Sequence, residues 1–291
     1  MLSILSSFLP RSKKPLTEEG GSSPADRHRS PRLLLPLLFI ASCSAPQQDV
    51  EIPFEIRFGE KSLSCTSGID GMALTDLRFY VHDIRLVTAD NDERRLTLID
   101  DPLWQNAEVA LLDFESGEER CTNGTEQTND VIRGRAPRGD YVGLKFRVGV
   151  PERLNHADPL RADAPLSYTF MHWHWRTGYK FLRAGLAGEN DSFWIHLGST
   201  RCERTADNAT GCRSGNRPAV ALSPYVPGKD VVELDLQALV NGINLEDGTA
   251  SDCSSGPSER ECQMPFIALG IDFSSGDAVA APTVFRVGQR K

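Results

Sequence analysis

The stretch LRFYVHDIRLV, residues 77–87, decides which class of fold this chain can form. Its first apolar residues share one parity: Leu77, Phe79 and Val81. Alternation with a period of two is typical of a β-strand that buries one face. Its next apolar residues have the opposite parity: Ile84 and Leu86. A change of phase inside a strand indicates a β-bulge, and bulges are common beside functional sites because they re-aim side chains. We therefore predict a bulge at His82–Asp83 and treat His82 as a candidate site residue.

Strand-like patterns recur along the rest of the chain. The clearest is GLKFRVGVP at 143–151, which ends in a proline that cannot donate to a ladder. The other predicted strands are 52–58, 95–99, 109–114, 167–175, 179–183, 193–197, 231–236 and 265–273. A short helix is predicted within 235–243. The chain also has 24 glycines and 18 prolines, so the sequence predicts an all-β fold, a single β-sandwich-like domain with long loops clipped by disulfides.

Composition limits the classes of function. The chain has 291 residues and is 40% hydrophobic, which suffices for one large or two small domains with a real core. Its formal net charge of −8 argues against a nucleic-acid surface, which needs clustered lysine and arginine. The sequence contains no Gly-x-Ser-x-Gly elbow, phosphate loop or His-Glu-x-x-His motif, so these classes of enzyme are not predicted.

The amino-terminal region predicts export. LLLPLLFIA at 33–41 is too short to span a bilayer but suits the hydrophobic part of a signal peptide. IASC at 40–43 resembles a bacterial lipoprotein signal, which implies cleavage before Cys43, its acylation and anchoring to a membrane of the cell envelope. Ser44 favours the outer membrane. The predicted signal peptide, linker and β domain are 1–42, 43–51 and 52–291. The alternative is an ordinary cleaved signal peptide that leaves Cys43 as a spare thiol.

Six cysteines follow Cys43, and an even number in an oxidising compartment is typical of disulfides rather than thiolate metal ligands. Six cysteines allow fifteen pairings. The short loops between them favour Cys202–Cys212 and Cys253–Cys262, and this leaves Cys65–Cys121 as the third pair. The chain has no Cys-x-x-Cys motif, so neither a thioredoxin site nor a zinc ribbon is predicted.

Histidine and tryptophan gather in one part of the chain. The histidines after the signal peptide are His82, His156, His172, His174 and His196. Near four of them lie Met171, Trp173, Trp175 and Trp194. When the cysteines are oxidised, histidine and methionine are the remaining soft or borderline ligands. Imidazole suits copper, zinc, nickel and iron, and a thioether shifts the choice towards Cu(I). The sequence therefore predicts a metal site.

Strand parity within MHWHWRTGYKF, residues 171–181, divides these candidates. In a strand over 168–175, one face carries Tyr168, Phe170, His172 and His174. The other face carries Thr169, Met171, Trp173 and Trp175. Histidines that ligate beside the Met/Trp face must then come from elsewhere, and His82, His156 and His196 are available. The alternative is a purely structural role, in which the Met/Trp face belongs to the hydrophobic core and His172 and His174 face solvent.

Several segments resemble the MbnP family, also described as the four-Cys-motif protein of the metallo-mystery pair. They are DLRFYVHDIRL, WQNAEVALLDFESGEERCTNGTEQTN, YVGLKFRVGVPERLNHADPL, MHWHWRTGYKF, HLGSTRC and the Cys253–Cys262 pair. Together they cover most of 52–272 in the order of the family. The resemblance implies a β-sandwich-like domain and a periplasmic or surface protein that binds one copper ion, as Cu(I) or Cu(II), and is not itself an enzyme.

The resemblance also implies a partner and a set of site residues. The partner is MbnH, a MauG-like dihaem relative of cytochrome c peroxidase that oxidises a tryptophan to kynurenine. Trp173 or Trp175 matches the oxidised position. His156 in LNH, His196 in HLGS and His82 in YVHD match the positions of the histidines. The kynurenine would then join histidines at a copper site that serves copper handling.

Two other functions remain open on the sequence. A disulfide-stapled ligand-binding module would use its tryptophans to stack on a ligand, and it would carry no stoichiometric metal. A zinc metallohydrolase is the least supported function, because no carboxylate stands at a spacing that would make it the base of a histidine site.

Overall fold

The structure, a computed structural model, describes residues 45–290 except 70, 175, 205–209 and 247–249. The predicted signal peptide (1–42) and the predicted acylation site Cys43 lie outside these residues. Among the residues described, none of the helices is both long and apolar enough to cross a bilayer.

Strand β3 (Ala73–Thr88), which contains the stretch LRFYVHDIRLV, organises the first sheet. Its amino-terminal part pairs with β11 and its carboxy-terminal part with β8, while β6 and β4 also pair with it. The ladder shifts register between His82 and Arg85, and Asp83 has a φ of +49°. The bulge predicted from the change of parity is therefore confirmed. Its effect is that the apolar residues before and after it are all buried.

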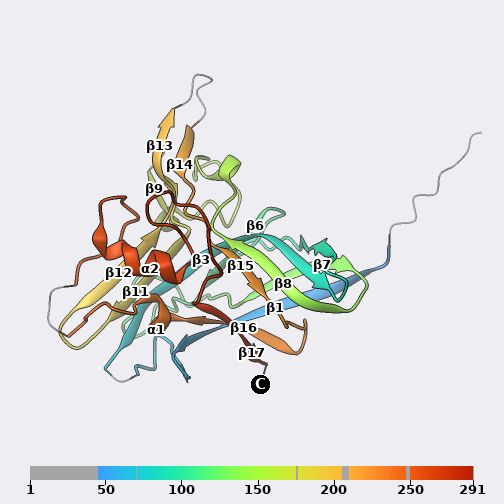
Figure 1. Ribbon diagram of the computed structural model, residues 1–291, viewed down its shortest axis with the longest axis horizontal. Helices are drawn as coiled ribbons and strands as arrows, with labels where there is room; N and C mark the ends of the chain where they lie inside the picture. Colours follow the sequence, from blue (N-terminus) through green and yellow to red (C-terminus); the bar gives the residue numbers. More distant parts are fainter. Residues whose placement is uncertain (1–44, 70, 175, 205–209, 247–249, 291) are drawn as a thin grey trace, which may run out of the picture. The chain divides into compact units, whose positions relative to one another are not determined.

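Among the described residues, seven strands form this sheet, in the order β12–β11–β3–β8–β15 with β4 and β6 attached to β3. The other strands are β4 (Glu93–Arg95), β6 (Val109–Asp113), β8 (Tyr141–Val148), β11 (Leu182–Ala187), β12 (Ser192–Leu197) and β15 (Ala219–Leu222). A second sheet of six described strands has the order β17–β16–β1–β7–β5, with β2 on β1. Its strands are β1 (Gln47–Phe58), β2 (Lys61–Ser62), β5 (Thr97–Leu98), β7 (Val131–Pro137), β16 (Asp230–Asp235) and β17 (Phe285–Gln289). Figure 1 shows the strands of both sheets.

Four phenylalanines join the two sheets. Phe54 of β1 lies 5.8 Å from both Phe79 of β3 and Phe146 of β8, measured between ring centroids. Phe285 of β17 lies 6.3 Å from Phe79 and 5.5 Å from Phe146. All four contacts are edge-to-face, and burying each ring stabilises the fold by about 1.5–3 kcal/mol. The predicted all-β fold is confirmed, and these rings form the core between its sheets.

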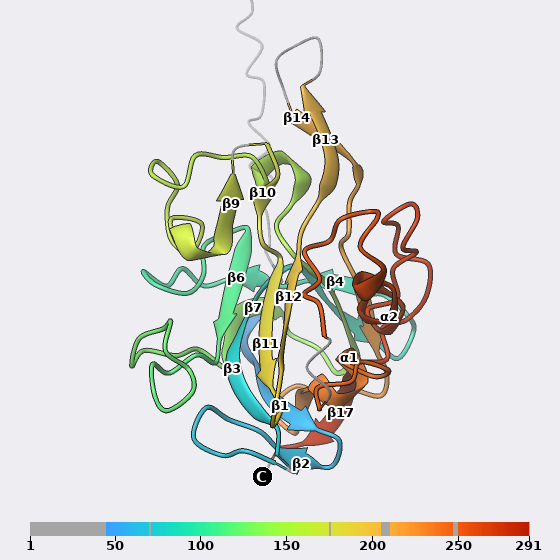
Figure 2. The same ribbon diagram turned by 90° about the vertical axis from the view of Figure 1, so that its left-hand side faces the viewer.

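The three predicted disulfides are confirmed: Cys65–Cys121, Cys202–Cys212 and Cys253–Cys262. Cys202 and Cys212 face each other in a hairpin of β13 (Thr200–Arg204) and β14 (Thr210–Ser214). In both views this hairpin extends beyond the two large sheets (Figure 1, Figure 2). A smaller hairpin, β9 (His172–His174) and β10 (Gly178–Tyr179), stands at the end of β11 and β12 where β10 leads into β11 (Figure 2).

Several boundaries differ from the prediction. β1 begins at Gln47, so the last five residues of the predicted linker, 47–51, belong to a strand. The strand predicted over 167–175 is wrong in its first half, because Thr169–Met171 form the short 3₁₀ helix η2 and only His172–His174 are extended. The common face predicted for Met171 and Trp173 is therefore lost. Other helices of the described residues include η1 (Glu152–Leu154), η3 (Arg260–Cys262) and α1 (Leu236–Leu239), the last within the predicted helical region.

The strand predicted over 265–273 is wrong, because helix α2 (Gln263–Ala268) occupies its first part. Pro265 lies in the first turn, where a missing N–H costs little. Gly270 ends the helix with a φ of +69°, and the N–H of Ile271 donates to the carbonyl of Phe266. This is a Schellman ending, which needs a residue that tolerates a left-handed backbone. The last strand is instead β17, which the sequence pattern did not predict.

Candidate metal centre

Two neighbouring residues of β9 contribute to different groups of side chains. Trp173 lies beside His196 of β12, with 6.1 Å between ring centroids and an edge-to-face angle of 81°. His172 lies against Tyr179 of β10, with 5.0 Å between ring centroids. Because successive side chains of a strand point to opposite faces, one short strand supplies both groups. The rest of the site is built around these two contacts.

The tryptophan–histidine group is held by β12 and by its neighbouring loop. Trp194 and His196 share one face of β12, and their ring centroids are 5.9 Å apart. The backbone N–H of His196 donates to the carbonyl of Cys253, so the Cys253–Cys262 loop fixes this end of the strand. Gly198 makes room for the indole, since a Cβ there would lie 2.5 Å from Cζ3 of Trp173. The Trp173 ring is therefore closely confined.

One ring nitrogen of His196 has no hydrogen-bond partner among the described residues. This nitrogen, Nε2, is buried and no described group bonds it. The pKa of His196 is lowered from 6.5 to about 4, chiefly by burial and also by the nearby cations Lys180 and Arg183. The ring is thus neutral at neutral pH, and a neutral imidazole nitrogen is the form that binds metals. An orphaned buried nitrogen beside Trp173 is the feature that best fits a metal ligand.

A second group forms around His172. Its Nε2 is also buried without a described partner. The pKa of His172 is lowered, chiefly by burial and then by the positive charge that His174 can carry, with a further contribution from His156. These three histidines, spread over two segments, are therefore close enough to interact. The strand-parity prediction made His172 a possible solvent-facing residue, but the tertiary structure gives it the properties of a ligand.

His156 is placed by its neighbour in the chain. Asn155 is fully buried, and its Oδ1 accepts a hydrogen bond of 3.1 Å from the backbone N–H of Tyr179. A Cβ on Gly178, which has a φ of +79°, would overlap Asn155, so glycine is required at that turn. Nε2 of His156 lies 3.3 Å from Sγ of Cys212 and 3.3 Å from Nδ2 of Asn155. The loop is therefore fixed against both small hairpins.

The other predicted ligands have different surroundings. Nδ1 of His82 is 2.8 Å from the carbonyl of Gly149, and burial lowers the pKa of His82 to about 4. These contacts do not join it to either histidine group, so its ligand role stays a prediction. Met171 is fully buried and contributes a backbone carbonyl to the N–H of Lys180. Trp175 lies outside the described residues.

Two cations border His196 that the sequence did not single out. Lys180 donates from Nζ to the carbonyl of Phe170 at 3.1 Å, and burial lowers its pKa to about 8. Arg183 is the cross-strand neighbour of His196 and lies over the Trp194 ring at 5.3 Å. The guanidinium of Arg183 is also 2.9 Å from the fully buried Asp76. Arg183 can be recognised as a neighbour of His196 only when the register between β11 and β12 is known, and the sequence does not give that register.

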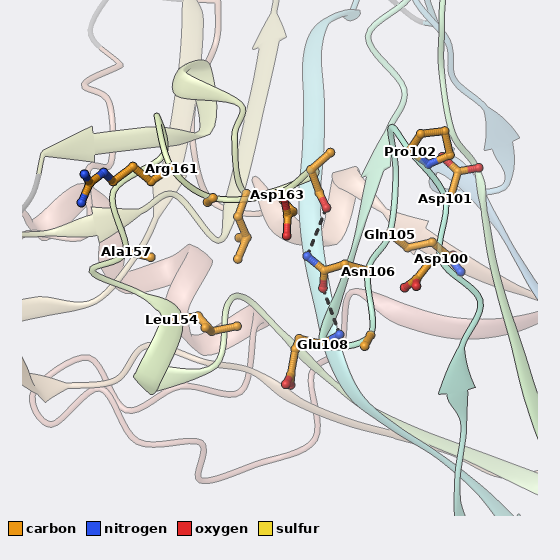
Figure 3. Close-up of a pocket in the computed structure, with 14 residues that line it drawn as sticks. Asp100, Asp101, Pro102, Gln105, Asn106, Glu108, Leu154, Ala157, Arg161 and Asp163 are labelled. Atoms are coloured by element: carbon orange, nitrogen blue, oxygen red, sulfur yellow. Dashed lines mark hydrogen bonds between the residues drawn. The ribbon is translucent and has the colours of Figure 1, made fainter.

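A separate cavity of about 850 Å³ lies beside the His156 loop. Figure 3 shows Asn106 between its two walls. The amide of Asn106 donates to the carbonyl of Ala164 at 3.1 Å, while its Oδ1 accepts from the N–H of Glu108 at 2.9 Å. The lining includes several carboxylates but neither histidine nor tryptophan. The cavity is therefore distinct from the histidine groups, and Asn106 ties one of its walls to the other.

Comparisons with known proteins agree with this architecture. The sequence profile of the MbnP family matches residues 47–257. The chain belongs to the MbnP family. Among solved structures, MbnP from Methylosinus trichosporium superposes with a TM-score of 0.74 and 26% sequence identity, over 84% of this chain and 100% of the other. A search of curated proteins finds no significant match. The family resemblance seen in the sequence motifs is thus confirmed.

Proposed function

We propose that this protein is an exported copper-binding protein that holds one copper ion next to His196 and Trp173. The observation that carries the proposal is the buried, unpartnered and neutral Nε2 of His196 with an indole packed at its side. Imidazole is a good ligand for copper in either common oxidation state. Membership of the MbnP family supports copper over zinc or nickel.

Further ligands would come from the second group. His172 has a buried Nε2 without a described partner, and it interacts with His156. Among the described residues, groups of three close side chains able to hold a metal each include a disulfide-bonded cysteine pair. Among the described residues, the histidines of the two groups therefore leave room for a further ligand at a copper site.

Oxidation of Trp173 to kynurenine would supply that ligand. The indole N–H is a donor only and has no free lone pair for a metal. Kynurenine carries an aniline nitrogen and a ketone oxygen, both able to approach a cation. Trp173 matches the oxidised position in the family, and its ring lies beside His196. We therefore assign the oxidation to Trp173.

We further propose an enzyme partner and a cellular location for this protein. A MauG-like dihaem enzyme of the MbnH type would carry out the oxidation with a peroxide as the oxidant, and this protein would be its substrate rather than an enzyme itself. Two peroxides would add two oxygen atoms across the C2–C3 bond of the indole and leave as two waters, and hydrolysis would then release the C2 carbon as formate. The signal sequence would place it in the cell envelope, anchored through a lipid on Cys43. Its role would lie in copper handling.

The test is to produce the protein with and without its dihaem partner and to measure metal content and peptide masses. We expect stoichiometric copper only after coexpression, together with loss of one carbon and gain of one oxygen in the peptide that contains Trp173. Trp173→Phe and His196→Ala should each lose copper. The matched control is Trp104→Phe, because Trp104 lines a different cavity, and this variant should retain copper. Full copper retention in His196→Ala would refute the proposed site.

One observation favours the alternative of a ligand-binding module. A cavity of about 230 Å³ is lined by Trp104, Tyr168 and Phe170, with the buried Arg78 on its wall. Arg78 lies over the Phe170 ring at 4.4 Å. The cavity is smaller than the roughly 300–1,000 Å³ of usual small-molecule sites. Binding of an aromatic ligand that Trp104→Ala abolishes, by protein that contains no metal, would support this alternative.

A further inference from the structure

We propose that the Cys202–Cys212 disulfide, once reduced, forms a metal site with His156 for a cation of the Zn²⁺ or Cu⁺ class. The site would open and close with the redox state of one hairpin. Its two sulfur ligands do not depend on copper binding at His196 and Trp173, whereas His156 would be shared if the second histidine group also bound copper.

The three ligand atoms are already close together. Nε2 of His156, Sγ of Cys202 and Sγ of Cys212 all lie within 4.8 Å of one another, and Nε2 is 3.3 Å from Sγ of Cys212. In a tetrahedral site, metal–sulfur distances of about 2.3 Å and metal–nitrogen distances of about 2.0–2.1 Å separate sulfur from nitrogen by roughly 3.6 Å and the two sulfurs by roughly 3.8 Å. The distance from Nε2 of His156 to Sγ of Cys212 thus needs to change by only a few tenths of an ångström.

The two cysteines are held in register whether or not they are bonded. They are directly opposite each other in the β13–β14 ladder, with their Cα atoms 3.9 Å apart. In the disulfide the two sulfurs are bonded to each other, so neither is a thiolate that can bind a cation. After reduction, rotation about the Cα–Cβ bonds separates the sulfurs while the hairpin holds their backbones. The hairpin is therefore able to act as a two-thiolate clamp.

The histidine arm is rigid. Asn155, the preceding residue, is fully buried and bonded to the backbone of Tyr179, so the chain position of His156 is set by the core. The contact of Nε2 with the Asn155 amide, at 3.3 Å, is longer than a usual N–H donor distance of about 2.7–3.2 Å. A cation can therefore displace it at little cost. A fixed histidine opposite an adjustable cysteine pair is a favourable arrangement for binding.

This disulfide is also the one that a reductant can reach. Cys202 and Cys212 are half-buried in a hairpin that extends beyond the sheets, whereas both cysteines of each other disulfide are buried (Figure 1). Reduction is therefore expected here before the core disulfides open.

The chemistry balances with a dithiol as the reductant. A dithiol donates two electrons and two protons, its own sulfurs join in a new S–S bond, and the Cys202–Cys212 bond breaks to give two thiols. Binding of a divalent cation then releases the two thiol protons and forms two metal–sulfur bonds. A small-molecule disulfide acting as the oxidant would take up two electrons and become a dithiol, the Cys202–Cys212 bond would form again, and the cation would be expelled.

The experiment is limited reduction of the full-length protein, anaerobic removal of the reductant and titration with Co²⁺, a spectroscopic substitute for Zn²⁺. We expect one equivalent to give a thiolate-to-cobalt charge-transfer band that Zn²⁺ abolishes. Alkylation and peptide mass analysis should find Cys202 and Cys212 as the reduced pair. The unreduced protein should show no such band.

Variants separate the ligands. His156→Ala should weaken Co²⁺ binding by at least about tenfold, as expected for loss of a ligand when outer-shell changes already cost about that much. His174→Ala, an exposed neighbour, and His196→Ala should leave binding unchanged, the latter whether or not copper binds there. The double change of Cys202 and Cys212 to Ser should abolish the band without touching the core. Three results would overturn the proposal. His156→Ala could bind Co²⁺ with unchanged affinity, the reduced wild type could give no charge-transfer band, or a buried disulfide could open before Cys202–Cys212.

Discussion

Acid should destabilise this protein through His82, and the structure sets the size of the effect. The ring is 7% exposed, and burial lowers its pKa from 6.5 to about 4 in the fold. The hydrogen bond to Gly149 and the charge of Asp83 act in the opposite direction, whereas Arg217 and Arg147 add to the lowering. Because the unfolded chain takes up the proton at a higher pH than the folded one, stability falls as the pH decreases from about 6.5 to about 4.

The magnitude follows from the shift in pKa. A difference of about 2.5 units, at about 1.4 kcal/mol per unit, corresponds to roughly 3 kcal/mol. His82→Asn removes the titration and keeps an N–H donor that can reach the carbonyl of Gly149. The free energy of unfolding of the wild type should therefore drop by roughly 3 kcal/mol more than that of His82→Asn between pH 7 and pH 4.

The assay is urea denaturation of metal-free protein at a series of pH values, followed by far-ultraviolet circular dichroism. The comparison between two proteins matters, because other groups titrate in the same range. Burial also lowers the pKa of His196 to about 4, whereas it raises the pKa of Asp113 to about 7, which stabilises the fold as the pH falls. Both contributions are common to the two proteins and cancel. Parallel stability curves would refute the reasoning, since they would mean that His82 takes up its proton without unfolding.

Three further outcomes test the packing around the site and the core. Gly198→Ala should displace the Trp173 indole and reduce its oxidation by the dihaem partner, as measured by peptide masses. The control is Gly215→Ala, which should be oxidised like the wild type because its Cβ meets no atom closer than 3.5 Å. Lys180→Met should raise the pKa of His196 towards its ordinary value, and unchanged imidazole shifts in an NMR titration would count against the contact. Phe54→Ala should lower the free energy of unfolding by about 3–5 kcal/mol, whereas the exposed Val279→Ala should change it by less than about 0.5 kcal/mol, as measured by denaturant titration.

Local patterns in the sequence were informative where the physical cause is local. The bulge at His82–Asp83 was predictable because a strand that buries one face must keep its apolar parity, and a break in parity needs an extra residue. The short disulfides were predictable because nearby cysteines find each other at small entropic cost. The helix at Gln263–Ala268 was misread, although Pro265 and Gly270 carried the signals for its two ends.

The sequence by itself determined the all-β class, the bulged central strand and the cysteine pairs. Only the tertiary structure decided which buried imidazole has a ring nitrogen without a hydrogen-bond partner among the described residues. His82 and His196 are both buried with pKa values lowered to about 4, yet His82 bonds the carbonyl of Gly149 while Nε2 of His196 has no described partner. The physical reason is that partners come from segments far apart in the chain. Parity along one strand cannot show which of those segments arrives.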